Sequence, residues 1–116
     1  MSHQVQINYE AIAIQCNSIC EVAEKQLKEL DRLLAEIESE SKQLLNEQTR
    51  ALKRQILSER ESLLEEMKQL RERADRRTLS STREATNLQK RVNELASQKI
   101  IAFDETLRTL LGDRLQ

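Results

Sequence analysis

Apolar residues recur every eleven positions along almost the whole chain. Eleven residues span three turns of about 3.67 residues each, close to the ordinary α-helix, so residues spaced in this way share one helix face. Such a helix becomes stable in water only when its apolar face packs against another helix. One track runs through Ile12, Ala23, Leu34, Leu45, Ile56, Met67, Ile100 and Leu111, and a second through Ile19, Leu30, Leu52, Leu63, Ala74, Ala85, Ala96 and Leu107.

The composition supports a helical reading and excludes others. The 116 residues include no proline, one glycine and only 2% aromatic residues, while 34% are charged. Coiled coils and long helices have this composition, whereas β and α/β folds need turn-forming residues that are missing here. We therefore predict an all-α fold: a long amphipathic helix or a two-helix hairpin that forms an antiparallel coiled coil or helical bundle. Residues 1–7 are predicted to be a flexible N-terminus and residues 8–112 the helical domain.

Two segments are alternative sites for a turn. The stretch ADRRTLSSTREA, residues 74–85, is rich in hydroxyl side chains that compete for backbone hydrogen bonds, and Ser81 with Glu84 has capping-box spacing. Ser58 with Glu61 has the same spacing. The sequence predicts a turn near 58–61 or 78–82, although the unbroken eleven-residue phase favours a helix that continues past residue 58. Gly112 is expected to end the last helix.

Charge is distributed unevenly along the chain. Residues 21–40 carry seven acidic against three basic side chains, and residues 68–91 carry eight basic against three acidic ones. An antiparallel arrangement brings the two segments together, with a symmetry point between about 55 and 60, and charge of this kind selects partner orientation. Two architectures satisfy the pattern: a hairpin that folds back near Ser58, or an antiparallel dimer of rods about 150 Å long.

The apolar stripe is the predicted interface. We expect a non-enzymatic interaction or structural protein that self-associates, or binds a partner helix, through this stripe. Its partner is then a second copy of the chain or another helical protein. The residues expected to form the interface are Ile12, Ile19, Leu30, Leu34, Leu45, Leu52, Ile56, Leu63, Leu70 and Leu107.

Cys16 and Cys20 are the only thiols, and their spacing places them on one helix face. We interpret both as small core residues beside Ile12 and Ile19, because free cysteine behaves as a small apolar side chain. Half of a shared zinc site and an interchain disulfide are the alternatives. A zinc site needs further ligands at short spacing, and the only histidine is His3. We therefore expect no metal and no cofactor.

Other functional classes find little support in the residues. A catalytic triad lacks a suitably placed histidine, and a phosphate-binding loop lacks glycines, since Gly112 is the only one. The basic segment 68–91 favours a nucleic-acid-binding helix pair as an alternative function, but a net charge of −1 and the few aromatic residues do not. No segment is predicted to span a membrane, and without a signal-peptide pattern the protein is expected in the cytoplasm, or exported without a cleaved signal.

The stretch QINYEAI, residues 6–12, followed by an amphipathic helix, resembles the start of small helical-hairpin proteins of type VII secretion. The resemblance covers about seven residues, and the Trp-Xaa-Gly turn of that family is absent because the chain has no tryptophan. The resemblance implies a further alternative function, that of a small helical accessory or adaptor protein of a secretion or toxin system. It implies no individual site residues.

Overall fold

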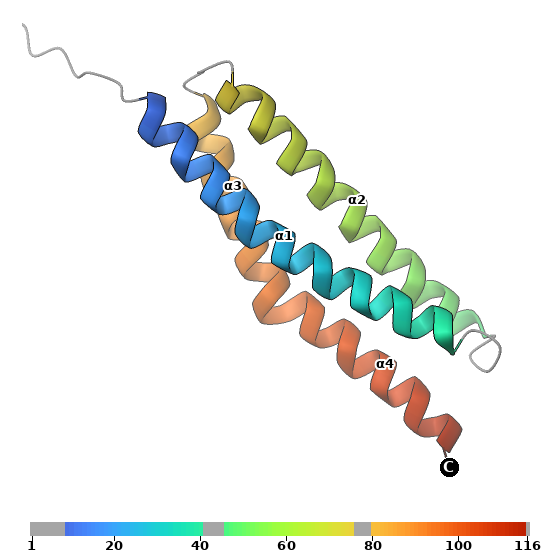
Figure 1. Cartoon of the computed structure of the whole chain (residues 1–116). Coiled ribbons are helices and arrows are strands. Elements are labelled where there is room, and N and C mark those ends of the chain that lie inside the picture. Colours follow the sequence, from blue (N-terminus) through green and yellow to red (C-terminus); the bar gives the residue numbers. More distant parts are fainter. Residues whose placement is uncertain (1–8, 41–45, 76–79, 116) are drawn as a thin grey trace, which may run out of the picture.

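The computed structural model describes residues 9–40, 46–75 and 80–115. Helix α1 comprises Tyr9–Ser39 and α2 comprises Glu47–Asp75. The third rod consists of α3 (Ser80–Glu94), the short π-helix η1 (Leu95–Lys99) and α4 (Ile100–Leu115). Figure 1 shows α1 and α2 side by side, with α3 crossing behind α1 and continuing as α4. The prediction of an all-α helical bundle is confirmed.

The chain folds back on itself between helices and forms neither of the two predicted architectures. Its principal extents are 75 × 21 × 18 Å, about half the length of the predicted rod. The alternative of a turn at 58–61 is wrong, because these residues lie inside α2, which continues past residue 58 as the eleven-residue phase favours. Of the alternative turn at 78–82, Ser80–Thr82 belong to α3, and Thr78 and Leu79 lie outside the described residues, in the gap between α2 and α3. The predicted end at Gly112 is also wrong, since α4 continues to Leu115.

An asparagine starts α2 at a place that the sequence analysis did not identify as a break. The side-chain Oδ1 of Asn46 accepts a hydrogen bond of 2.8 Å from the backbone N–H of Thr49, which is a helix N-cap. Six residues before Asn46, the N–H of Glu40 donates to the carbonyls of Glu36 and Ile37 at the end of α1, both at 3.2 Å. The first helix therefore ends, and the second begins, at positions that lie outside both predicted turns.

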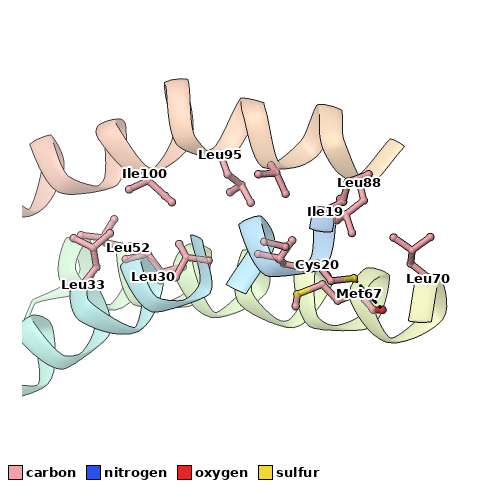
Figure 2. Packing of buried hydrophobic residues seen from close by; sticks show 14 of the residues in the cluster. Ile19, Cys20, Leu30, Leu33, Leu52, Met67, Leu70, Leu88, Leu95 and Ile100 are labelled. Carbon is pink, nitrogen blue, oxygen red and sulfur yellow. Dashed lines mark hydrogen bonds between the residues drawn. The ribbon is translucent and has the colours of Figure 1, made fainter. Parts of the chain in front are cut away.

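The core lies along the axis where the three rods meet. Figure 2 shows Leu88, Leu95 and Ile100 of the third rod facing buried residues of α1 and α2. Most of the eleven-residue tracks are buried there, and burying each large aliphatic side chain contributes about 1.5–3 kcal/mol. The largest fully buried side chains are Leu30, Leu33, Ile56, Leu63, Leu70, Leu88, Leu95, Leu107, Val92, Cys16 and Cys20.

The π-helix rotates the residues that follow it, so that the apolar residues of α4 face the core. The N–H of Ile100 donates to the carbonyl of Leu95, five residues earlier, which adds one residue to that turn. Leu95 and Ile100 are both buried as a result, although they are five positions apart. Ala96, a member of the predicted apolar track, is exposed instead. A strict eleven-residue period therefore fails at this turn.

Ion pairs between the helices show their relative direction and register. Glu24 with Arg71 at 2.5 Å, Asp31 with Arg60 at 2.7 Å and Glu38 with Lys53 at 3.2 Å join α1 to α2. The residue numbers rise on one helix as they fall on the other, so α1 and α2 are antiparallel. Because residues 31 and 60 pair, the symmetry point lies near residue 46, and the predicted point between 55 and 60 is wrong.

The third rod runs in the same direction as α1. Glu36 pairs with Arg108 at 2.5 Å, and Arg32 approaches Asp104 at 3.6 Å, so both residue numbers rise together. The topology is therefore up, down and up, with antiparallel neighbours on both sides of α2.

Candidate functional site

The predicted interface residues form the interior of the single chain. Seven of the ten are buried: Ile19, Leu30, Leu52, Ile56, Leu63, Leu70 and Leu107. Ile12 and Leu34 are half-buried and pack against this cluster, and Leu45 lies outside the described residues. Binding of another chain through the stripe would require the bundle to open. An interaction of the closed bundle must use side chains that the fold leaves exposed.

Both cysteines lie in the core between α1 and α2. Neither side chain is accessible to solvent, and the Sγ of Cys20 contacts the backbone carbonyl of Met67 at 4.0 Å. Burial raises the pKa of the Cys20 thiol, and the nearby Arg71 guanidinium only partly opposes that rise. The protonated, unreactive thiol is therefore favoured at neutral pH. Within the described ranges, no cluster of three metal-ligating side chains of the histidine, cysteine or carboxylate type occurs.

Three of the eight basic side chains in segment 68–91 pair with carboxylates of the same chain. Arg71 pairs with Glu24 of α1, Arg73 with Glu84 of α3, and Arg91 with two glutamates of α2. Arg76 and Arg77 lie outside the described residues. Because these three cations already have carboxylate partners, the segment presents a weaker field to a phosphate backbone than its composition suggests.

A half-buried ion network links α2 to the third rod. Glu59, whose side chain is 19% exposed, accepts hydrogen bonds from Arg91 at 2.9 Å and from Lys99 at 2.7 Å. Arg91 also donates to Glu66 at 3.0 Å. Lys99 is the last residue of the π-helix, so the widened turn carries this cation. The network fixes the alignment of α2 and α3 and surrounds one end of a surface groove.

The groove lies between α2 and α4. Its wider part, about 440 Å³, is lined by Arg54, Gln55, Ser58, Glu59, Lys99, Ala102 and Phe103. A second hollow of about 380 Å³, lined by Gln48, Thr106, Thr109 and Leu110, continues it along the same two helices. Small side chains leave this space open. Together we call the two hollows the α2–α4 groove.

Short side chains on α2 and α4 are the feature of the sequence that corresponds to this groove. Small or short polar residues recur on α2 at Ala51, Ser58 and Ser62, of which Ser58 lines the groove. They recur again on α4 at Ala102, Thr106 and Thr109. Neither run could be assigned to a groove before the two helices were known to be neighbours, because both also fit a solvent-exposed helix face.

The comparisons with known proteins found no family model, no curated protein and no solved structure that matches this chain. Among the described helices, none is both long enough and apolar enough to cross a membrane.

Proposed function

We propose that this protein is a non-enzymatic helical interaction module that binds an amphipathic helix of a partner protein in the α2–α4 groove. The observation that carries the proposal is the groove itself: an open, mostly apolar hollow that runs along two helices beside Phe103 and Leu110. Grooves between helices accept the apolar face of a third helix, with side chains at helical spacing as anchors. As in the sequence-based prediction, the partner is a helix. The proposed binding surface, however, is the exposed groove, because the apolar stripe is buried inside the bundle.

The charges around the groove favour an acidic partner helix. Arg54 and Lys99 line its wider part. Glu59, the carboxylate in that lining, is already held by two cations, Arg91 and Lys99. The ion pair between Arg54 and Glu47 is highly exposed on both sides and is therefore weak and easily exchanged. A partner helix with leucines along one face and glutamates beside them would place its carboxylates near Arg54.

Two synthetic helical peptides test the proposal, one with leucines flanked by glutamates and one with lysines replacing the glutamates. Fluorescence anisotropy with the full chain should show binding of the acidic peptide and much weaker binding of the basic one. Ala102→Glu, inside the groove, should weaken binding of the acidic peptide by about tenfold or more. Ile101→Glu, which adds the same charge to the neighbouring exposed residue outside the groove lining, is the matched control.

Two results would contradict the proposal. One is equal affinity for both peptides, and the other is an equal effect of the two substitutions. Circular dichroism confirms that both variants stay folded, which is expected because both side chains are exposed.

A further inference from the structure

The contact between α1 and α2 is symmetric about the segment that joins the two helices. Asp31 pairs with Arg60 at 2.7 Å and Glu38 with Lys53 at 3.2 Å, so both pairs are centred near residue 46. Figure 1 shows the end of α1 beside the start of α2 at this point. A second copy of the chain, related by a twofold axis near residue 46, would therefore offer its α2 to α1 of the first copy in the same register.

The buried faces of α1 and α2 keep one phase along the sequence. Leu30 of α1 and Leu52 of α2 are both buried and lie 22 positions apart. Ala23 of α1 and Ile56 of α2 are also buried and lie 33 positions apart. These separations are six and nine turns of about 3.67 residues. A single helix that ran through both segments would therefore carry both apolar faces on one side.

The joining segment has the composition of a helix. Residues 40–46, ESKQLLN, include no glycine and no proline, and glutamate, lysine, glutamine and leucine are good helix formers. The eleven-residue track passes through this segment at Leu45, midway between Leu34 and Ile56. The N-cap at Asn46 favours the closed chain, whereas the burial of Leu45 between two copies favours a continuous helix.

We infer that two copies of this chain exchange α1 to form an antiparallel domain-swapped dimer, in which α1 and α2 of each copy join into one continuous helix. Each α1 then packs on α2 of the partner subunit through the side chains that it uses in the single chain. Asp31 pairs with Arg60 of the partner subunit, and Glu38 with Lys53 of the partner subunit. The surface that covers the apolar stripe of α1 is therefore the same in both forms.

The third rod fits this arrangement. It stays on α2 of its own chain, held by its ion pairs there, and covers α1 of the partner subunit, where Arg108 meets Glu36 of the partner subunit. Since Arg108 is level with Glu36, the end of α4 at Leu115 is level with residue 43. The two third rods therefore end on opposite sides of the twofold axis and do not collide. The α2–α4 groove lies within one chain in both forms.

Refolding from urea at low and at high concentration, followed by light scattering and small-angle X-ray scattering, tests the dimer. Dilute refolding should give a monomer with a length near 75 Å, and concentrated refolding a dimer about twice as long. Gln43→Pro should raise the dimer dissociation constant by about a hundredfold or more, because proline interrupts a helix interior and occurs once in each copy. In the monomer this position lies between α1 and α2. Gln43→Ala is the matched control and should leave the dimer intact.

Two single-cysteine variants test the exchange directly. Asp31→Cys in one chain and Arg60→Cys in a second, tagged chain are refolded together and treated with a short bismaleimide cross-linker. The two chains should become linked, because the exchange places these positions side by side across the dimer. Asp31→Cys with Glu72→Cys is the control and should not be linked, since residue 72 lies about 18 Å further along α2 than residue 60. The wild-type chain controls for the native thiols, which are buried.

Any of three results would overturn the inference. One is a monomer after refolding at every concentration. Another is a dimer that Gln43→Pro and Gln43→Ala affect equally, and the third is a dimer in which Asp31→Cys and Arg60→Cys are not linked. Circular dichroism checks that the proline variant folds, and the cross-linking result does not depend on it. The groove variant Ala102→Glu should leave the dimer intact, so this inference and the proposed function can fail separately.

Discussion

Arg91 of α3 donates a hydrogen bond of 2.9 Å to Glu59 of α2, and the two side chains are only 24% and 19% exposed. Lys99 donates to the same carboxylate from the end of the π-helix. Removal of one partner from a half-buried charge network leaves the others desolvated and unpaired, which costs more than the loss of an exposed pair. The α2–α3 contact is therefore expected to be more sensitive to charge removal than the α1–α2 contact.

Glu59→Ala should lower the free energy of unfolding by about 1–3 kcal/mol, because Arg91 and Lys99 lose their shared acceptor. Glu38→Ala is the matched control. Its carboxylate is 69% exposed and pairs with Lys53, so the loss should stay below about 1 kcal/mol. Urea denaturation followed by circular dichroism measures both. Equal losses would show that the network contributes no more than a surface pair.

Leu30→Ala should destabilise the bundle by about 2–5 kcal/mol, because Leu30 is fully buried and its truncation leaves a cavity in the core. Ile14→Ala, on the same helix, should change stability by less than about 1 kcal/mol, because Ile14 is 61% exposed. Thermal and urea unfolding of both variants measure the difference. A small loss for Leu30→Ala would mean that the described core is not the one present in solution.

Asn46→Ala should cost about 1 kcal/mol, because the N–H of Thr49 loses its side-chain acceptor at the start of α2. Asn46→Asp keeps an acceptor oxygen at the same position and should retain most of the stability. Gln48→Ala, two residues further on at an exposed position, is the control for a change of helix propensity alone. A loss for Asn46→Asp as large as that for Asn46→Ala would contradict the capping role.

Gly112→Ala should stabilise α4 by about 0.5–1 kcal/mol. Gly112 lies within the helix, and a Cβ atom built there meets no other atom within 4 Å. Alanine loses less backbone entropy than glycine on helix formation, so the substitution favours the folded state. Denaturant unfolding checks the sign. Destabilisation would indicate that the helix ends at Gly112 in solution, as the sequence analysis expected.

The raised pKa of Cys20 predicts how stability changes at alkaline pH. Because burial raises the thiol pKa in the folded state, the unfolded chain loses this proton first as the pH rises. The unfolded state then binds fewer protons than the folded state, so stability is retained below the ordinary thiol pKa of about 8.5 and falls above it. Cys20→Ala should show a shallower decline between neutral and alkaline pH. Equal slopes for the two proteins would contradict this.

The eleven-residue pattern predicted most of the core but not the path of the chain. Leu30, Ile56 and Leu63 are buried as expected, because side-chain position on a helix depends only on local spacing. The breaks were misplaced because phase continuity is the same for one long helix and for helices that fold back. The N-cap at Asn46 could have been predicted, because asparagine is a common N-cap residue. The π-helix at Leu95–Lys99 could not, because the eleven-residue spacing does not predict an added residue in one turn.

The charge pattern predicted antiparallel pairing of the acidic and basic segments, and in the antiparallel pair of α1 and α2 Glu24 of the acidic segment binds Arg71 of the basic one. It did not predict that Glu59 would share Arg91 and Lys99, because these residues become neighbours only when the third rod packs on α2. The α2–α4 groove was missed for the same reason. Glu59 is 32 positions from Arg91 and 40 from Lys99, and the groove joins α2 to α4, so local spacing carries no information about either feature.

The sequence by itself determined that this protein is helical and which side of each helix is apolar, because both depend on the repeat and on the near absence of turn residues. Only the tertiary structure decided what covers that side. Burial of an apolar face is favourable whether the covering helix belongs to the same chain or to another. The choice depends on where the chain reverses and on the ion pairs that align the rods, and it leaves the α2–α4 groove and the side chains of Leu57 and Leu64 exposed.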